Sequence, residues 1–130
     1  MINNYDYKAC FTAMVKWMEA IEDNKSLSDY LLQCGYKNVA IYEAREIGRL
    51  LYNQLKNSSL HIECIIERNA ESLNELMEIP VIRPSQALLL KNVDVIIVTP
   101  FENYDAVNEY FMNLGINTPT ISLRDMLYEL

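Results

Sequence analysis

The stretch 38–51 reads NVAIYEAREIGRLL. Its short apolar run, 39–42, is typical of a central parallel strand that is covered on both faces. A turn and a helix over about 45–56 follow, so the stretch is expected to be the first strand–turn–helix unit of an α/β domain. In nucleotide-binding domains of this kind, glycines let the backbone approach a phosphate at the helix N-terminus.

The glycine pattern Gly-x-Gly-x-x-Gly is incomplete at this turn. Glu43 and Arg45 occupy the first two glycine positions, and only Gly48 matches, at the position that packs helix against strand. The Glu43 carboxylate would repel a phosphate, and the bulk of Arg45 would block the backbone. Ordinary dinucleotide binding is therefore disfavoured. The alternative is a rearranged anion site that uses the Arg45 guanidinium and the helix N-terminus, unless a local pairing with Glu43 cancels that gain.

Composition indicates one globular domain. The chain has 130 residues, of which 51% are hydrophobic and 22% charged, and its net charge is −7. This acidic balance argues against nucleic acid as a partner, because phosphate backbones require a basic face. Three cysteines cannot all be paired, which favours a reducing compartment. No apolar run approaches the roughly 18–20 residues that span a bilayer, so we expect no membrane insertion and a cytoplasmic location.

Two helices are expected before the first strand. Apolar residues recur every three or four positions over about 6–22, and Trp17 widens the stripe. Such a wide stripe suggests a homodimer with Trp17 as its anchor, although the core of its own chain is the favoured place for Trp17. Ser26 and Asp29 form a capping-box-like start to a second helix, which Gly35 ends. Residues 1–36 are thus predicted to be a helical extension of an α/β domain over 37–130.

Further strands and helices alternate along the rest of the chain. This alternation predicts a three-layer parallel sheet of about five strands with right-handed crossovers. Pro80 suits an edge strand better than a central one. The polar segment 70–78 fits either a loop or a short helix. The remaining strands are expected at 60–67, 79–82, 94–100 and 118–121, and the remaining helices at 84–89, 104–114 and 122–130.

Residues 37–126 resemble a known family. The matching stretches are VAIY at 39–42, EIGRLL at 46–51, CIIERN at 64–69, IPVI at 79–82 and DVIIVT at 94–99. They resemble the small Rossmann-like, nucleotide-sugar- or CoA-binding-like domain of bacterial polysaccharide biosynthesis proteins, which stands at the N-terminus of sugar epimerase/dehydratases and of sialic-acid-type O-acetyltransferases. The resemblance implies a small nucleotide ligand, with NAD(P) or a nucleotide-sugar as the candidates.

Candidate ligand contacts follow three strands. Glu67 ends the second strand, where an acidic residue holds a ribose hydroxyl in this fold, and Arg68 beside it favours a phosphate. A solvated strand end is the alternative for both. After the strand 94–100, Thr99 is a hydrogen-bond donor and Phe101 a surface for a flat ring. Asn103 fits a donor or merely the N-cap of the next helix.

The sequence offers no catalytic or metal-binding constellation. His61 stands near the start of the second strand, away from the expected ligand edge, and has no visible partner for base or metal work. Tyr52 and Lys56 have the spacing of a dehydrogenase pair but lie on the wrong helix. Three hypotheses remain: a non-catalytic binding module with an altered phosphate loop, a homodimerising interaction module, and an NAD(P)-dependent nucleotide-sugar epimerase or reductase fragment. The last is least expected, because there is little room for a substrate domain.

Overall fold

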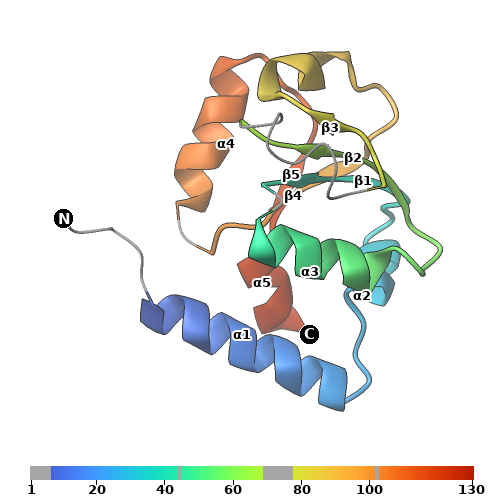
Figure 1. Ribbon diagram of the computed structural model, residues 1–130, viewed down its shortest axis with the longest axis vertical. Coiled ribbons are helices and arrows are strands. Elements are labelled where there is room, and N and C mark those ends of the chain that lie inside the picture. Colours follow the sequence, from blue (N-terminus) through green and yellow to red (C-terminus); the bar gives the residue numbers. More distant parts are fainter. Residues whose placement is uncertain (1–6, 44, 69–77, 102) are drawn as a thin grey trace.

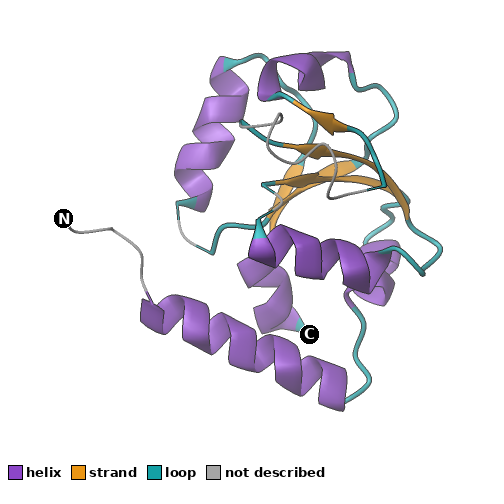
Figure 2. Ribbon diagram, in the orientation of Figure 1, coloured by secondary structure: helices purple, strands orange, loops and turns teal. Residues whose placement is uncertain are grey.

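The computed structural model describes residues 7–43, 45–68, 78–101 and 103–130. Helices surround one sheet, as Figures 1 and 2 show. The helices are α1 (Tyr7–Glu22), α2 (Leu27–Gln33), α3 (Glu46–Leu55), α4 (Tyr104–Asn113) and α5 (Leu123–Glu129), with the 3₁₀ helix η2 (Pro84–Leu89). The strands are β1 (Asn38–Tyr42), β2 (His61–Ile66), β3 (Val81–Ile82), β4 (Val95–Val98) and β5 (Thr120–Ser122).

The sheet has five strands in the order β3-β2-β1-β4-β5, and every neighbouring pair is parallel. The predicted three-layer Rossmann-like architecture is therefore confirmed. β3 lies at an edge, as Pro80 indicated, and the Pro80 carbonyl accepts a hydrogen bond from the Ile65 N–H at 2.9 Å. Strand order reverses at β1, which lies between β2 and β4. Ligands of open α/β sheets bind beyond the carboxyl ends of the strands at such a point.

Side chains that alternate between the two faces of the sheet form two separate hydrophobic cores. Val39 and Ile41 of β1 face a core formed with α1, α2, α3 and α5, whereas Ala40 and Tyr42 face a second core formed with η2 and α4. Both faces of β1 are buried because parallel strands carry helices on each side. This burial explains why the run 39–42 contains no charged residue.

The N-terminal helices follow the sequence closely. The Ser26 side chain accepts the Asp29 N–H at 3.2 Å, and Gly35 takes the left-handed conformation that ends α2. α1 packs on α5 and lies at the rim of the molecule (Figure 1). Trp17 is only 4% exposed and belongs to the core of its own chain. Its predicted role as a homodimer anchor is therefore corrected, because a side chain buried within the chain is not available to a partner.

Several boundaries differ from expectation. Segment 84–89 forms a 3₁₀ helix, and the strand expected over 94–100 is shorter, Val95–Val98. The segment 70–78, predicted as loop or helix, lies outside the described residues except for Glu78. Within the ranges that the structure describes, no helix combines the length and apolar character needed to cross a bilayer.

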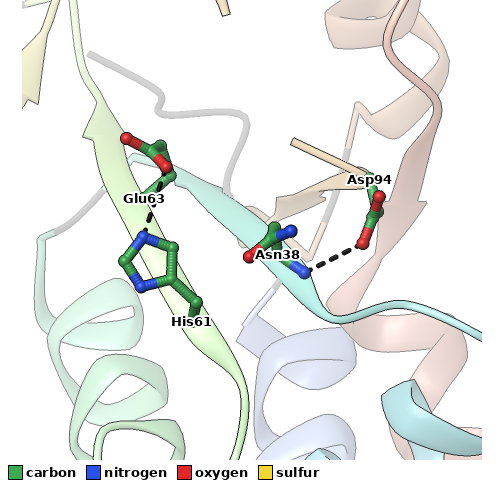
Figure 3. Close-up of polar contacts among 4 residues, drawn as sticks. All are labelled: Asn38, His61, Glu63 and Asp94. Carbon is green, nitrogen blue, oxygen red and sulfur yellow. Dashed lines mark hydrogen bonds and ion pairs between the residues drawn. The ribbon is translucent and has the colours of Figure 1, made fainter. Parts of the chain in front are cut away.

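The amino ends of the strands carry their own polar contacts, shown in Figure 3. His61 begins β2 and lies 3.2 Å from Glu63. The Asp94 carboxylate accepts the Asn38 N–H at 2.9 Å, which joins β1 to the start of β4. It also accepts the Lys37 N–H at 2.8 Å. These two backbone hydrogen bonds lower the pKa of Asp94. His61 thus lies at the amino end of β2, away from the expected ligand edge, as the sequence predicted.

Asp94→Asn is expected to lower stability at pH 7 but not at strongly acidic pH. Because the pKa of Asp94 is lowered by folding, its contribution is present above the unfolded pKa of about 3.9 and lost as pH falls through the folded pKa. Urea unfolding midpoints at pH 7 and in acid measure the effect. Asp23→Asn, after the end of α1, is the matched control. An equal midpoint difference at both pH values would contradict this account.

Candidate ligand-binding site

Glu43 occupies the turn between β1 and α3 in a left-handed conformation, with φ of +65°. This is the region that glycine adopts without a steric cost, and Glu43 stands at the first glycine position of the nucleotide-binding pattern. The Glu43 N–H donates to the Ile66 carbonyl at 2.9 Å, and its carbonyl accepts from the Thr99 hydroxyl at 2.7 Å. Hydrogen bonds to β2 and to the end of β4 thus hold the N–H and the carbonyl of Glu43. Because of them, this residue stays in a backbone conformation that glycine usually adopts.

Thr99 ties β1 to the end of β4. Its side chain is buried, and Oγ1 lies 2.9 Å from the Tyr42 carbonyl and 2.7 Å from the Glu43 carbonyl. The single hydroxyl proton is therefore shared between two backbone acceptors. Thr99 was predicted as a ligand donor, but in this structure its hydroxyl is engaged in holding the turn at the point where strand order reverses.

Three charged side chains lie near Glu43, namely those of Glu67, Arg45 and Arg68. Burial, followed by the nearby Glu67 carboxylate, raises the pKa of Glu43, while the guanidinium groups of Arg45 and Arg68 oppose the rise. Glu67 is 3% exposed, and its N–H donates to the Ile82 carbonyl at 2.8 Å. The structure thus brings together three of the predicted binding residues, Arg45, Glu67 and Arg68, at the carboxyl ends of β1 and β2.

Tyr42 and Tyr110 complete this cluster, and sequence reasoning missed both. The Arg68 guanidinium lies 4.3 Å from the Tyr110 ring centre and hydrogen-bonds to the Tyr42 hydroxyl. Burial and the Glu43 carboxylate raise the pKa of Tyr42 to about 12. The Tyr42 ring also meets Phe111 edge-on, with centroids 4.9 Å apart. The position of Tyr42 in an apolar strand predicts only a core residue. The one feature of the sequence that could have indicated a polar contact is its hydroxyl group at the end of the strand.

Arg45 lies at the exposed edge of the cluster, whereas Gly48, Phe101 and Asn103 do not belong to it. Arg45 is exposed at the N-cap of α3, and Gly48 is buried in the first turn of that helix. Phe101 is 4% exposed and packs in the core with α1 and α5, so most of its ring is not a surface for a ligand. Asn103 takes the N-cap position of α4 in a left-handed conformation but makes no side-chain capping hydrogen bond.

A depression of about 570 Å³ lies beside the ends of β4 and β5. Phe101 and Asn103 line it, together with Ser122 and Arg124, which the sequence did not single out. Asp105 and Asp125 also line it, and their carboxylates offset the charge of Arg124. The depression therefore suits a neutral polar group better than an anion.

The cluster combines carboxylates with guanidinium groups. Carboxylates accept hydrogen bonds from sugar hydroxyls, and guanidinium groups bind phosphate. Within the described residues, no group of three or more His, Cys, Asp or Glu side chains is placed to hold a metal ion. The cluster therefore offers contacts for a hydroxyl-bearing, phosphate-bearing ligand.

Restoring the first glycine is expected to stabilise the protein. Glu43→Gly removes a left-handed penalty of about 1–2 kcal/mol, partly offset by the greater flexibility of glycine in the unfolded chain, for a net gain of about 1 kcal/mol. Urea unfolding at pH 7 measures the gain. Glu43→Ala also removes the carboxylate but keeps Cβ and therefore the strain, so it is the control, and Glu43→Gly should be more stable than Glu43→Ala by about 1 kcal/mol. A loss of stability in Glu43→Gly would contradict the assignment.

Charge at position 43 adds a separate, pH-dependent effect. Because folding raises the pKa of Glu43, the ionised carboxylate costs stability above the folded pKa, and this cost disappears as pH falls below the unfolded value. Glu43→Gln is therefore expected to raise stability at pH 7 and to lose that advantage in acid, whereas the gain of Glu43→Gly persists.

Comparison with protein-family models found no match, and comparison with curated proteins found none either. Among solved structures, the chain is similar to UDP-D-quinovosamine 4-dehydrogenase from Vibrio fischeri, with a TM-score of 0.51 and 22% sequence identity over 72% of this chain and 85% of that chain. Both this likeness and the order of the five parallel strands lead to the same conclusion: the chain has a Rossmann-like α/β fold.

Proposed function

We propose that the protein is an accessory, non-catalytic module that binds a nucleotide-sugar through an altered phosphate loop, in the context of bacterial surface polysaccharide biosynthesis. The observation that carries the proposal is the left-handed conformation of Glu43, which stands at the first glycine position of the nucleotide-binding pattern, where strand order reverses. The similar solved structure bears the name of an enzyme of a UDP-sugar, which supports this ligand class.

Each charged residue has a role in this proposal. The Arg45 guanidinium, exposed at the N-terminus of α3, takes the phosphate that backbone N–H groups would otherwise hold. Glu67 is buried at the end of β2, so in this proposal it acts through its neighbour: its carboxylate lies near Glu43 and raises the pKa of that group. Arg68 is held against Tyr110 and positions the Tyr42 hydroxyl beside Glu43.

Thermal-shift measurements with UDP-sugars, NAD(H), NADP(H) and acetyl-CoA test the proposal. A ligand at 100 times its dissociation constant should add about 2.7 kcal/mol of apparent stability. Arg45→Ala should abolish most of the shift without changing the stability of the free protein, because Arg45 is exposed. His61→Ala, at the opposite end of the sheet, is the matched control. No shift with any of these ligands would rule out the binding module.

A second candidate function is a homodimerising interaction module. It is favoured by the apolar side chains that α1 exposes, among them Phe11 at 71% and Met18 at 60%. Sedimentation of the full chain at several concentrations tests this candidate independently of any ligand.

A further inference from the structure

We propose that the α1 helices of two copies pack antiparallel against each other to form a homodimer. The inference rests on the second candidate function and specifies its geometry. α1 has two apolar faces. One, with Ala13, Trp17 and Ala20, is buried in the core of its own chain. The other faces outward at the rim of the molecule, with α5 between α1 and the sheet (Figure 1).

The outer stripe of α1 consists of Tyr7, Phe11, Met14, Met18 and Ile21. Four of its members are exposed large hydrophobic side chains, and Met14 is partly buried against the core of its own chain. Single exposed apolar residues are ordinary, but a continuous row along one helix marks an interaction surface. We therefore expect the outer stripe to pack against an apolar surface of a partner.

The spacing of residues in the outer stripe indicates that the partner surface is another helix. Its residues follow one another at intervals of four, three, four and three, which is the seam of a helix that pairs with another helix. In an antiparallel pair, Phe11 lies opposite Ile21 of the second copy, and Met14 lies opposite Met18. The two-fold symmetry axis repeats both of these residue pairs with the copies exchanged, so the outer stripes of the two copies are complementary to each other.

Charge selects the antiparallel direction. Lys8 and Glu22 flank the stripe on one side, each seven positions from Val15. Lys8 lies in the first turn and Glu22 in the last, and α1 has no acidic residue in its first turn and no basic residue in its last. Both placements oppose the helix dipole. An antiparallel copy brings Glu22 beside Lys8 twice, whereas a parallel copy brings like charges to the same level.

Sedimentation velocity of the full chain over a concentration series tests the interface. Met18→Glu is expected to raise the dimer dissociation constant at least about 100-fold, because each copy loses an apolar contact and buries a carboxylate. Met112→Glu, on α4 and 67% exposed, is the matched control and should leave the constant unchanged. Far-UV circular dichroism confirms that each variant is folded, which is expected because both methionines are exposed.

Charge reversal tests the direction. Lys8→Glu and Glu22→Lys should each raise the dissociation constant about tenfold, and the two together should restore it, because the pairs are re-formed with opposite sign. A chain that stays monomeric overturns both the interaction module and its geometry. A dimer that Met18→Glu leaves intact overturns α1 as the contact while self-association stands. A dimer that the double reversal fails to restore overturns the antiparallel arrangement.

Discussion

Trp17→Ala is expected to lower the free energy of unfolding by about 3–5 kcal/mol, the usual cost of removing a buried aromatic side chain. Trp17 is 4% exposed and lies in the core that joins α1 and α5 to the sheet. Removal of the indole ring leaves a cavity that the closely packed core around it cannot fill. Urea unfolding followed by circular dichroism is the measurement, because Trp17 is the only tryptophan and its removal eliminates the fluorescence signal.

Two comparisons make this result specific. Trp17→Phe keeps much of the ring volume and should cost clearly less than Trp17→Ala. Phe11→Ala, on the exposed face of the same helix, should change the stability of the monomer little. If Trp17→Ala cost less than about 1 kcal/mol, Trp17 would not be a core residue.

Thr99→Val is expected to lower the free energy of unfolding by about 1–3 kcal/mol. Valine has nearly the same shape, so the change removes only the hydroxyl, whose oxygen lies 2.9 Å and 2.7 Å from the carbonyls of Tyr42 and Glu43. The Glu43 carbonyl, which is partly buried, then loses this donor. Because the same bond helps to hold the left-handed turn, Glu43→Gly should reduce the cost of Thr99→Val when the two changes are combined.

Matched substitutions separate the hydroxyl from the methyl group. Thr99→Ser keeps the donor and loses only about 0.8 kcal/mol for one buried methyl group. Thr12→Val removes a hydroxyl that donates to the Lys8 carbonyl at an exposed site on α1, and should be nearly neutral. Urea unfolding of the single and combined variants completes the double-mutant cycle. If Thr12→Val and Thr99→Val lowered the free energy of unfolding equally, the proposed stabilising hydrogen bonds between Thr99 and the end of β1 would be refuted.

Local patterns predicted much of the architecture. The cap formed by Ser26 and Asp29, the end of a helix at Gly35, and the edge strand after Pro80 all depend on neighbours in the chain, and the structure confirms them. The candidate site was predicted less completely. Arg45, Glu67 and Arg68 converge as expected because they follow adjacent parallel strands or the turn between strand and helix, whose ends share one edge of the sheet.

Other features depend on contacts between distant segments. The conformation of Glu43 is set by hydrogen bonds to Ile66 and Thr99, so the residue type at position 43 gave no sign that a glycine-type turn persists. Phe101 follows a strand end, where ligands commonly bind, yet it packs with helices from both ends of the chain. Tyr110 and Arg68 are far apart in the sequence, and their cation–π contact forms only because α4 packs over the sheet.

By itself, the sequence determined the alternation of strands and helices, the parallel sheet and the damaged glycine pattern, because apolar periodicity and backbone preferences act over a few residues. The tertiary structure alone decided which apolar face of α1 is core, where Phe101 and Thr99 are engaged, and how Glu43 keeps its turn. Burial and hydrogen bonding at these positions depend on which segments meet after folding, and a linear pattern of residue types does not contain that information.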